Sequence, residues 1–163
     1  MATGTDGHRI VNVNGLDWTG TDGDGGGWKR IAEEAGGTRL GCTYEEISPG
    51  GQPAQYHYHT TNEEALFVMG GTGTLRTPAG ETGIESGDYV SFPVGESGCH
   101  AVENTSSEPL KCLFFSTMDE PDIVVYPDSG KLHVVGGPAS GLPRDGLTFD
   151  ATTPFDIDDS VSG

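Results

Sequence analysis

The sequence has few basic residues and is especially poor in lysine. Its 163 residues contain 8 lysines and arginines against 25 aspartates and glutamates, which gives a formal net charge of −17. The lysines are Lys29, Lys111 and Lys131. A surface of this sign repels the phosphates of nucleic acids and the headgroups of anionic lipids. We therefore expect neither nucleic acid nor a membrane among the partners of this protein.

Long apolar runs and a secretory signal are also lacking. The sequence holds no run of about 18 apolar residues, the minimum length of a membrane-spanning helix. Its first residues, MATGTDGHRIVNVNG, have neither the basic cluster nor the apolar core of a signal peptide. The three cysteines are odd in number and widely spaced, which favours reduced thiols over a disulfide framework or a zinc knuckle. These features predict a cytoplasmic protein.

The acidic residues are scattered along the whole chain and form no single block. A scattered acidic surface with little lysine suits a high-salt cytoplasm, because dissolved ions screen the repulsion between like charges. We therefore predict a halophilic protein, a prediction about its habitat that leaves its chemistry open.

Glycine and proline punctuate the chain heavily, with 27 and 10 residues respectively. From residue 38 onward, short apolar stretches alternate with turn signals at a spacing of roughly 8–12 residues, which is typical of an antiparallel sandwich or barrel. The segment HRIVNVNGLDW predicts a leading strand, whereas WKRIAEEAGG is ambiguous between a helical turn and a strand. After Met118 the pattern weakens into one or two edge strands and a polar, acidic end.

This pattern predicts an all-β protein with three parts. Residues 1–37 form an N-terminal extension with the leading strand, residues 38–118 form the barrel, and residues 119–163 hold the C-terminal edge strands and an acidic tail. A small, open-ended barrel exposes strand edges, and exposed edges invite pairing with a second copy. We therefore expect a two-fold homodimer, the commonest closed symmetry.

The stretch QYHYHTTNEEALFVMGG places two histidines next to carboxylates. Residues two apart in a strand face the same side, so His57, His59 and Gln55 share one face. A following strand that begins at Glu64 can bring a carboxylate to the same interior. Such a nitrogen and oxygen donor set suits Fe(II), Mn(II), Co(II), Ni(II), Cu(II) or Zn(II). The alternative is a pair of surface histidines that bind nothing.

Two motifs decide between these alternatives, because together they resemble the cupin superfamily. The first motif reads Gly51, five residues, His57-Tyr58-His59, four residues, Glu64, six residues and Gly71. The second reads Gly87, five residues, Pro93-Val94-Gly95, four residues, His100, three residues and Asn104. The gap before His100 is four residues long where the short form of the motif has two. The resemblance covers residues 40 to 117.

The resemblance implies a fold and a metal site. The fold is a double-stranded β-helix, the cupin jelly-roll barrel, with short N- and C-terminal extensions. The metal ligands implied are His57, His59, Glu64 and His100, and Glu63 also satisfies the motif spacing as an alternative to Glu64. Three imidazoles and one carboxylate leave open positions on an octahedral ion for a substrate or for O₂.

The function follows less directly, because the sequence resembles small single-domain cupins that mostly lack an assigned reaction. One class is a metal-dependent enzyme acting on a small organic molecule, with Gln55 as a candidate pocket residue. The other is a non-catalytic module that binds or senses a small ligand around a structural metal. Within the enzyme class, apolar interior positions such as Leu66, Val68 and Val102, and the lack of an identifiable base, favour oxygen-dependent oxidation over isomerisation.

The acidic surface generates a first prediction about salt. We expect the protein to lose secondary structure in dilute buffer and to regain it at about 1–2 M KCl, because the Debye length then falls to roughly 3 Å. Far-UV circular dichroism along a KCl titration measures this change. A full native spectrum in dilute buffer would contradict the predicted halophilic character.

Overall fold

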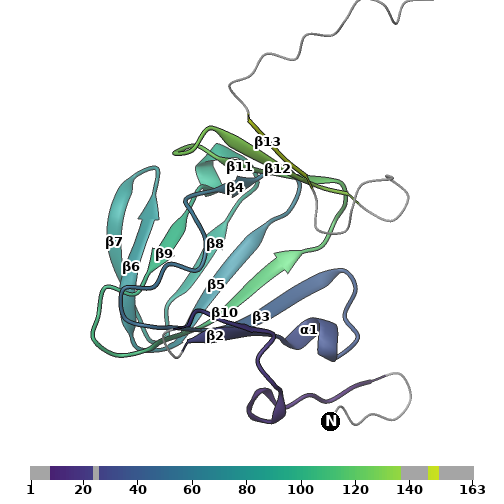
Figure 1. Ribbon diagram of the computed structural model, residues 1–163, viewed down its shortest axis with the longest axis vertical. Helices are drawn as coiled ribbons and strands as arrows, with labels where there is room; N and C mark the ends of the chain where they lie inside the picture. Colours follow the sequence, from purple (N-terminus) through teal and green to yellow (C-terminus); the bar gives the residue numbers. More distant parts are fainter. Residues whose placement is uncertain (1–7, 24–25, 137–146, 151–163) are drawn as a thin grey trace, which may run out of the picture.

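A computed structural model describes residues 8–23, 26–136 and 147–150 of the chain. Strands dominate these ranges (Figure 1). They are accompanied by one four-residue helix, α1 (Ile31–Glu34), and by two 3₁₀ turns, Val13–Gly15 and Glu96–Gly98. The all-β class predicted from the spacing of turns is confirmed.

The largest sheet has six antiparallel strands in the order β1-β2-β3-β10-β5-β8. Its strands are β1 (Gly20–Thr21), β2 (Gly27–Arg30), β3 (Leu40–Ile47), β5 (Glu64–Gly70), β8 (Tyr89–Phe92) and β10 (Leu110–Thr117). The segment WKRIAEEAGG, ambiguous in the sequence, contains both the end of β2 and helix α1.

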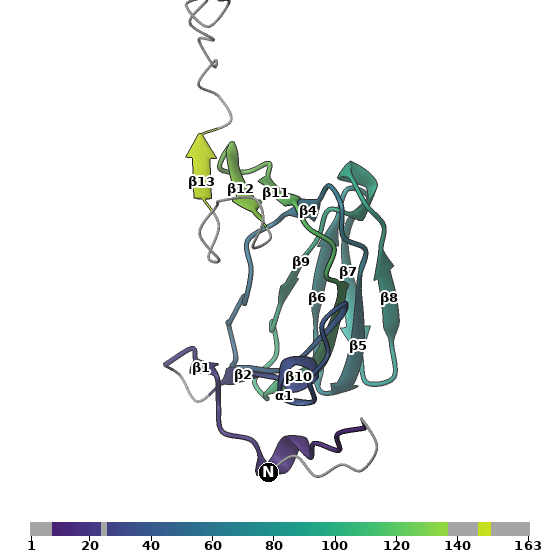
Figure 2. The same ribbon diagram turned by 90° about the vertical axis from the view of Figure 1, so that its right-hand side faces the viewer.

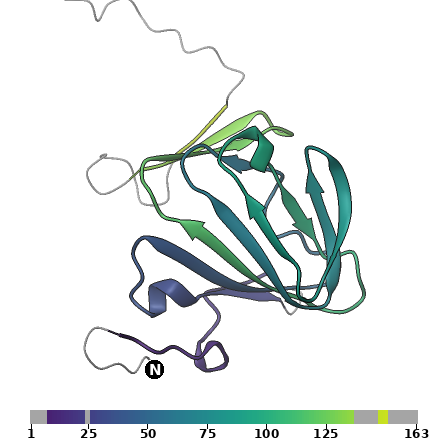
Figure 3. The ribbon, with the colours of Figure 1, turned by 180° about the vertical axis from the view of Figure 1, so that it is seen from behind.

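Two smaller sheets complete the barrel. The first has the order β7-β6-β9, and the second the order β13-β12-β11-β4. Their strands are β6 (Thr72–Thr77), β7 (Gly80–Glu85), β9 (Ala101–Glu103), β4 (Tyr58–His59), β11 (Asp122–Tyr126), β12 (Lys131–Val135) and β13 (Leu147–Asp150). Figures 1 and 2 show β4 and β11–β13 at one end of the barrel and α1 with the N-terminal segment at the other. Seen from behind, the hairpin of β6 and β7 lies at the edge of the barrel on the side away from α1 (Figure 3).

The inward faces of β5 and β10 form the apolar core. Leu66 and Val68 are fully buried, and their cross-strand neighbours on β10 are Phe114 and Cys112. These residues belong to a cluster that extends to the other sheets; its further members are Ile47, Leu75, Ile84, Phe92, Val102 and Leu110. Glu64 begins β5 on the same inward face as Leu66, so the core strand itself carries a carboxylate into the interior.

Two motif residues have structural roles. Gly71 has a φ of 85°, and a Cβ there would lie 2.5 Å from the carbonyl oxygen of Pro109, so only glycine fits without strain. Asn104 is fully buried and donates from Nδ2 to the carbonyl oxygens of Ile47 (2.7 Å) and Glu108 (2.8 Å). The hydrogen bonds of Asn104 thereby join the ends of β3 and β9 to the turn that precedes β10.

The N-terminal segment differs from its prediction. Where a leading strand was expected, residues 8–18 hold an isolated bridge at Ile10 and the 3₁₀ turn. The side chain of Asn12 accepts a hydrogen bond from the amide of Asn14 (2.9 Å). Asparagine side chains compete in this way with strand pairing, and the NVNG sequence therefore turns.

The C-terminal part contributes to the fold beyond the predicted edge. Strand β11 pairs with β4, the strand that carries His59, and β12 and β13 extend this sheet. The predicted acidic tail lies mostly outside the described residues, and the three-part division of the chain stays a prediction. Within the described ranges, no helix has the length and apolar character needed to span a membrane.

The packing of β5 generates a second prediction. Replacing Leu66 by alanine should lower the free energy of unfolding by about 2–5 kcal/mol, because the fully buried site leaves a cavity in the core. Urea denaturation in high salt measures the change. Met69→Ala is the matched control on the same strand, since the Met69 side chain is 46% exposed and should cost much less. Equal losses in both variants would contradict the assignment of the core.

Candidate metal centre

Three imidazoles converge on one carboxylate oxygen. The Nε2 atoms of His57, His59 and His100 lie 3.7, 3.3 and 3.5 Å from Oε2 of Glu64. His59 belongs to β4 and Glu64 opens β5, while His57 and His100 form an isolated bridge that joins the starts of β4 and β9. The cluster therefore lies where the three sheets meet.

Each imidazole is fixed through its other ring nitrogen. Nδ1 of His57 lies 2.6 Å from the carbonyl oxygen of Gln55, and Nδ1 of His100 lies 2.9 Å from that of Gly98. Nδ1 of His59 lies 2.5 Å from Oδ2 of Asp122. A carbonyl or carboxylate oxygen can only accept a hydrogen bond, so each Nδ1 is the donor. In the neutral rings, every Nε2 lone pair is consequently directed at the shared space beside Glu64.

Asp122 is the support that sequence reasoning missed. It is buried and receives further hydrogen bonds from Nδ2 of Asn62 (3.0 Å) and the amide of Thr61 (3.0 Å). Burial acts to raise the pKa of Asp122, but the hydrogen bonds from His59 and Asn62 hold it below its ordinary value. A carboxylate behind a histidine is the usual device for orienting a metal ligand. The only sequence signal was an acid at the start of the apolar run IVVY.

The second motif departs from the short cupin form for a visible reason. The longer gap before His100 contains the 3₁₀ turn Glu96–Gly98, and this turn supplies the carbonyl that holds His100. A Cβ at Gly98 would lie 1.7 Å from the carbonyl oxygen of Pro93, so the turn requires glycine. The ring of Phe92 stacks on His100 with centroids 3.6 Å apart and planes at 7°. The imidazole of His100 is therefore held on its face by the stacked ring of Phe92 and at its edge by the hydrogen bond from Nδ1.

The electrostatics of the cluster favour a neutral His100 beside the carboxylate of Glu64. Burial lowers the pKa of His100 to about 4. Burial acts to raise the pKa of Glu64, but the neighbouring ring of His57 and the charges of the histidines bring it below its ordinary value. Burial acts to lower the pKa of His57, yet the nearby carboxylate of Glu64 and the hydrogen bond to the carbonyl of Gln55 raise it. A metal ion binds the unprotonated nitrogen, so its binding would displace any proton from Nε2 of His57.

The structure distinguishes between the residues predicted for the site. Glu64 lies among the histidines, whereas Glu63 is exposed and its amide donates to Oγ1 of Thr117. The geometry therefore favours Glu64 over Glu63. The side chain of Gln55 is exposed, because this residue precedes β4 and the alternation of a strand does not apply to it. Gln55 contributes its main-chain carbonyl to His57.

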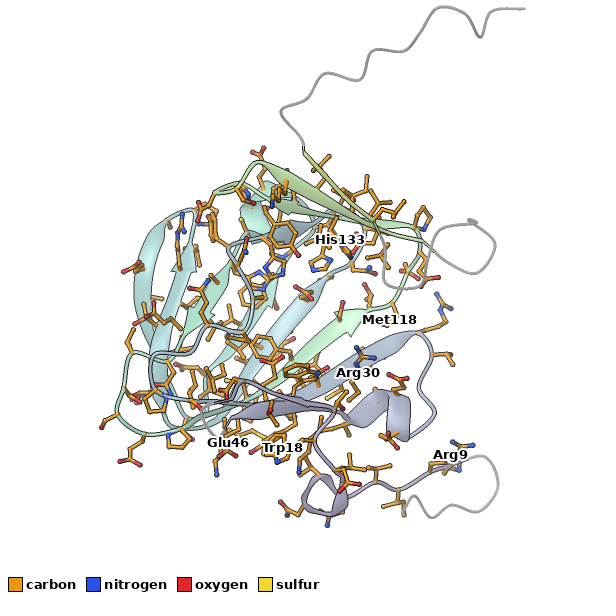
Figure 4. All side chains as sticks on the ribbon, viewed as in Figure 1. Arg9, Trp18, Arg30, Glu46, Met118 and His133 are labelled. Carbon is orange, nitrogen blue, oxygen red and sulfur yellow. The ribbon has the colours of Figure 1, made fainter. Side chains whose placement is uncertain are left out.

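The cluster opens into a cavity of about 910 Å³ that is lined by His57, Glu64 and His100. A smaller cavity of about 490 Å³ shares Arg30, Thr43, Glu45 and Pro53 with it. The walls of the larger cavity are mixed. Polar members include Arg30, Glu33, Thr38, Thr43, Glu45, Ser116 and Glu120, and apolar members include Leu40, Val102, Phe114, Phe115 and Met118. Figure 4 shows Arg30 above α1 and Met118 near the end of β10.

The donor set fits a divalent ion. Ligand atoms of His57, His59 and Glu64 all lie within 4.8 Å of one another, and His100 adds a third imidazole on the same carboxylate oxygen. Nitrogen and oxygen donors of this kind suit the borderline divalent metals. The four residues predicted from the motifs are thus brought together as a candidate metal site.

Comparison with solved structures supports the fold. A candidate sugar phosphate isomerase of Acidithiobacillus ferrooxidans is 28% identical, with a TM-score of 0.70 over 79% of each chain. A sugar phosphate isomerase of Silicibacter pomeroyi is 22% identical, with a TM-score of 0.72 over 83% of each chain. The polyketide cyclase RemF of Streptomyces resistomycificus is 19% identical, with a TM-score of 0.57 over 69% of this chain and 82% of its own. The last two likenesses concern the fold alone.

No curated protein matches the chain in sequence. The family model described as a cupin domain matches residues 43–116, the segment that runs from β3 to β10 and contains all four clustered residues. The double-stranded β-helix predicted from the two motifs is confirmed, and residues 43–116 of this chain form a cupin domain.

Proposed function

We propose that this cupin holds one divalent transition ion through His57, His59, Glu64 and His100 and acts as an enzyme on a small, oxygen-bearing organic molecule. The observation that carries the proposal is the set of three fixed imidazoles whose Nε2 atoms face one carboxylate oxygen. A bound ion of this class supplies Lewis acidity, which polarises a carbonyl or hydroxyl oxygen.

The cavity supports the enzyme class over a structural metal. A structural site is closed by its protein ligands and needs no space beside it. Here His57, Glu64 and His100 are themselves part of the wall of a cavity of about 910 Å³, a volume in the range that small-molecule sites occupy. The non-catalytic binding module remains the alternative, and it shares with the enzyme a small molecule as the proposed partner.

The polar walls support isomerisation of a sugar phosphate as the reaction. The sequence favoured oxidation partly because Leu66 and Val68 were expected to form an apolar interior around the site. Both residues lie in the closed core and do not line the cavity. Arg30 lines both cavities and offers the planar guanidinium that binds phosphate well. The neighbour at 28% identity is described as a candidate sugar phosphate isomerase, which agrees with this choice.

Oxygen-dependent oxidation is the second candidate. Phe114 and Phe115 give one wall of the cavity an aromatic character that suits an apolar substrate. The donor set also suits Fe(II), which supports oxygen chemistry in other proteins.

The first prediction from this proposal concerns the metal. Purified protein should contain about one divalent transition ion per chain, and Glu64→Gln or His100→Ala should lose it. Asp122→Asn should weaken metal affinity by about 10–100-fold, because His59 loses the carboxylate that orients its ring. Elemental analysis and calorimetric titration with Mn(II) or Zn(II) measure these changes.

Glu63→Gln and His8→Ala are the matched controls, since both side chains are exposed. They should retain the ion. A wild-type protein that remains metal-free after incubation with Fe(II), Mn(II), Ni(II) and Zn(II) would refute the site, and equal loss in Glu63→Gln and Glu64→Gln would refute the choice of ligand.

The second prediction concerns turnover. The metal-loaded protein should interconvert an aldose phosphate and its ketose, and Arg30→Gln should raise KM for the phosphorylated sugar by about 10–100-fold, because a charge-assisted pair is lost. Chromatography of products from three- to six-carbon sugars, with and without phosphate, measures this. Arg39→Gln is the control, because Arg39 is outside the cavity walls and is 87% exposed. Substrate-dependent O₂ uptake by the Fe(II)-loaded protein without isomer formation would favour oxidation instead.

A further inference from the structure

A second carboxyl group lies in the cavity, on a strand that contributes no residue to the metal cluster. Glu45 on β3 faces the barrel interior, where its cross-strand neighbours are Trp28 on β2 and Cys112 on β10. It belongs to the walls of both the larger and the smaller cavity, as do its neighbours Arg30 and Thr43. Glu45 therefore shares one cavity with the metal cluster and with Arg30.

The carboxylate of Glu45 differs from that of the neighbouring Glu46 in its contacts. Within the described part of the chain, no hydrogen bond or ion pair reaches its oxygens. Its neighbour Glu46 accepts from the hydroxyl of Tyr44 (3.0 Å) and pairs with Lys111 (3.8 Å). The described side chains contain no buried polar atom that lacks a hydrogen-bond partner, so the oxygens of Glu45 are open to the space of the cavity. A carboxylate in this position is available to a bound molecule.

The surroundings of Glu45 suit proton transfer near neutral pH. Burial, and after it the negative charge of Glu64, raise the pKa of Glu45 to about 7. Cys112 on β10 is its ionisable cross-strand neighbour. The other ionisable groups in the walls of the two cavities are Asp22, Arg30, Glu33, Cys42, Glu46, His57, Glu64, His100 and Glu120. The thiol of Cys112 stays neutral, because burial and the charge of Glu45 raise its pKa to about 12. An acid–base group works best when its pKa is close to the working pH.

We propose that Glu45 is the catalytic acid–base residue of this cavity and moves a proton between two adjacent carbons of the bound substrate. The inference rests on the proposed function, since it requires a substrate held between the metal cluster and Arg30. It also supplies the base whose absence from the motif strands had favoured oxidation.

The step balances without an added reactant. The carboxylate of Glu45 takes the proton from the carbon next to the carbonyl, and the electron pair of that C–H bond becomes the C=C bond of an enediol. The carboxylic acid then returns the proton to the former carbonyl carbon. The hydroxyl proton passes to the former carbonyl oxygen, so the aldose becomes the ketose with no net gain or loss of atoms or electrons.

Other carboxyl groups in the cavity fit this role less well. Glu33 is 70% exposed and pairs with Arg30 at 3.4 Å, so it lies at the solvent side of the cavity. Glu120 is exposed as well. Glu64 belongs to the donor set of the cluster. Glu45 is the one among these four that is partly buried and outside the metal cluster.

The test is isotope exchange in D₂O with the metal-loaded protein. Fructose 6-phosphate, ribulose 5-phosphate and their aldose isomers serve as probes, and NMR follows deuterium entering at carbons 1 and 2. Glu45→Gln should lower exchange by at least about 100-fold, since general acid–base catalysis contributes 10²–10⁴-fold. Glu45→Asp should restore part of it. Both variants should keep the ion and bind the probes as the wild type does, and Glu103→Gln, an exposed control, should exchange normally.

A second measurement follows Glu45 itself. In the Zn(II)-loaded protein with ¹³C-labelled glutamate, the carboxyl signal that disappears in Glu45→Gln should titrate well above the ordinary value of about 4.3. Titration at the ordinary value would count against the proposal, because it would describe a fully solvated carboxylate.

The outcomes separate this inference from the function on which it rests. If the wild type exchanges deuterium and Glu45→Gln exchanges it equally well, the role of Glu45 is wrong and the isomerase function stands. If the wild type turns over and exchanges none of the probes, the isomerase function fails, and the role of Glu45 fails with it. A variant that unfolds, as judged by circular dichroism, is replaced by Glu45→Asp, whose unchanged exchange rate and unshifted pH dependence would likewise overturn the role.

Discussion

The convergence of three imidazole nitrogens on one oxygen of Glu64 is the constraint on which the rest of the structure depends. His57 and His59 come from the start and the end of the β4 region, His100 precedes β9, and Glu64 comes from the strand that also carries the core residue Leu66. Polar groups buried next to an apolar core are unfavourable unless they are hydrogen-bonded. The structure meets this requirement at each Nδ1 and leaves each Nε2 facing the shared space.

The four residues of the candidate metal site were predictable from the sequence because their positions follow local rules. The alternation of a strand puts His57 and His59 on one face, and the motif spacing adds Glu64 and His100. Asp122 was not predictable, because it reaches His59 only through the pairing of β11 with β4, 63 residues along the chain. Gln55 is the opposite case, because the sequence predicted a side-chain contact that the structure does not show. Strand alternation was applied to a residue that precedes the strand, so its carbonyl and not its side chain meets the site.

Glu45 was hidden from sequence reasoning by the composition of its strand. Tyr44, Glu45 and Glu46 each carry a polar group, so the alternation of a strand alone does not show which of their side chains face the barrel interior. The contacts of the N-terminal segment show which face of β3 points outward. The ring of Trp18 lies against Tyr44 with centroids 6.2 Å apart, and Nζ of Lys29 lies 4.4 Å from the Trp18 ring. This cover occupies the outer face of β3 (Figure 4 labels Trp18 and Glu46 on this side), so Glu45 is left on the cavity face.

The predicted high-salt setting and the proposed anionic substrate are linked through the same charges. A protein with a net charge of −17 repels a phosphorylated sugar at long range, and Arg30 is the only basic residue in the walls of the two described cavities. At about 1 M salt the Debye length shrinks to roughly 3 Å, which removes the long-range repulsion but leaves direct contacts largely intact. Under these conditions recognition of the proposed substrate would depend on the residues that it touches in the cavity wall, which include the metal cluster, Arg30 and Glu45. An acidic surface is thus compatible with an anionic substrate, because dissolved salt at this concentration screens the approach.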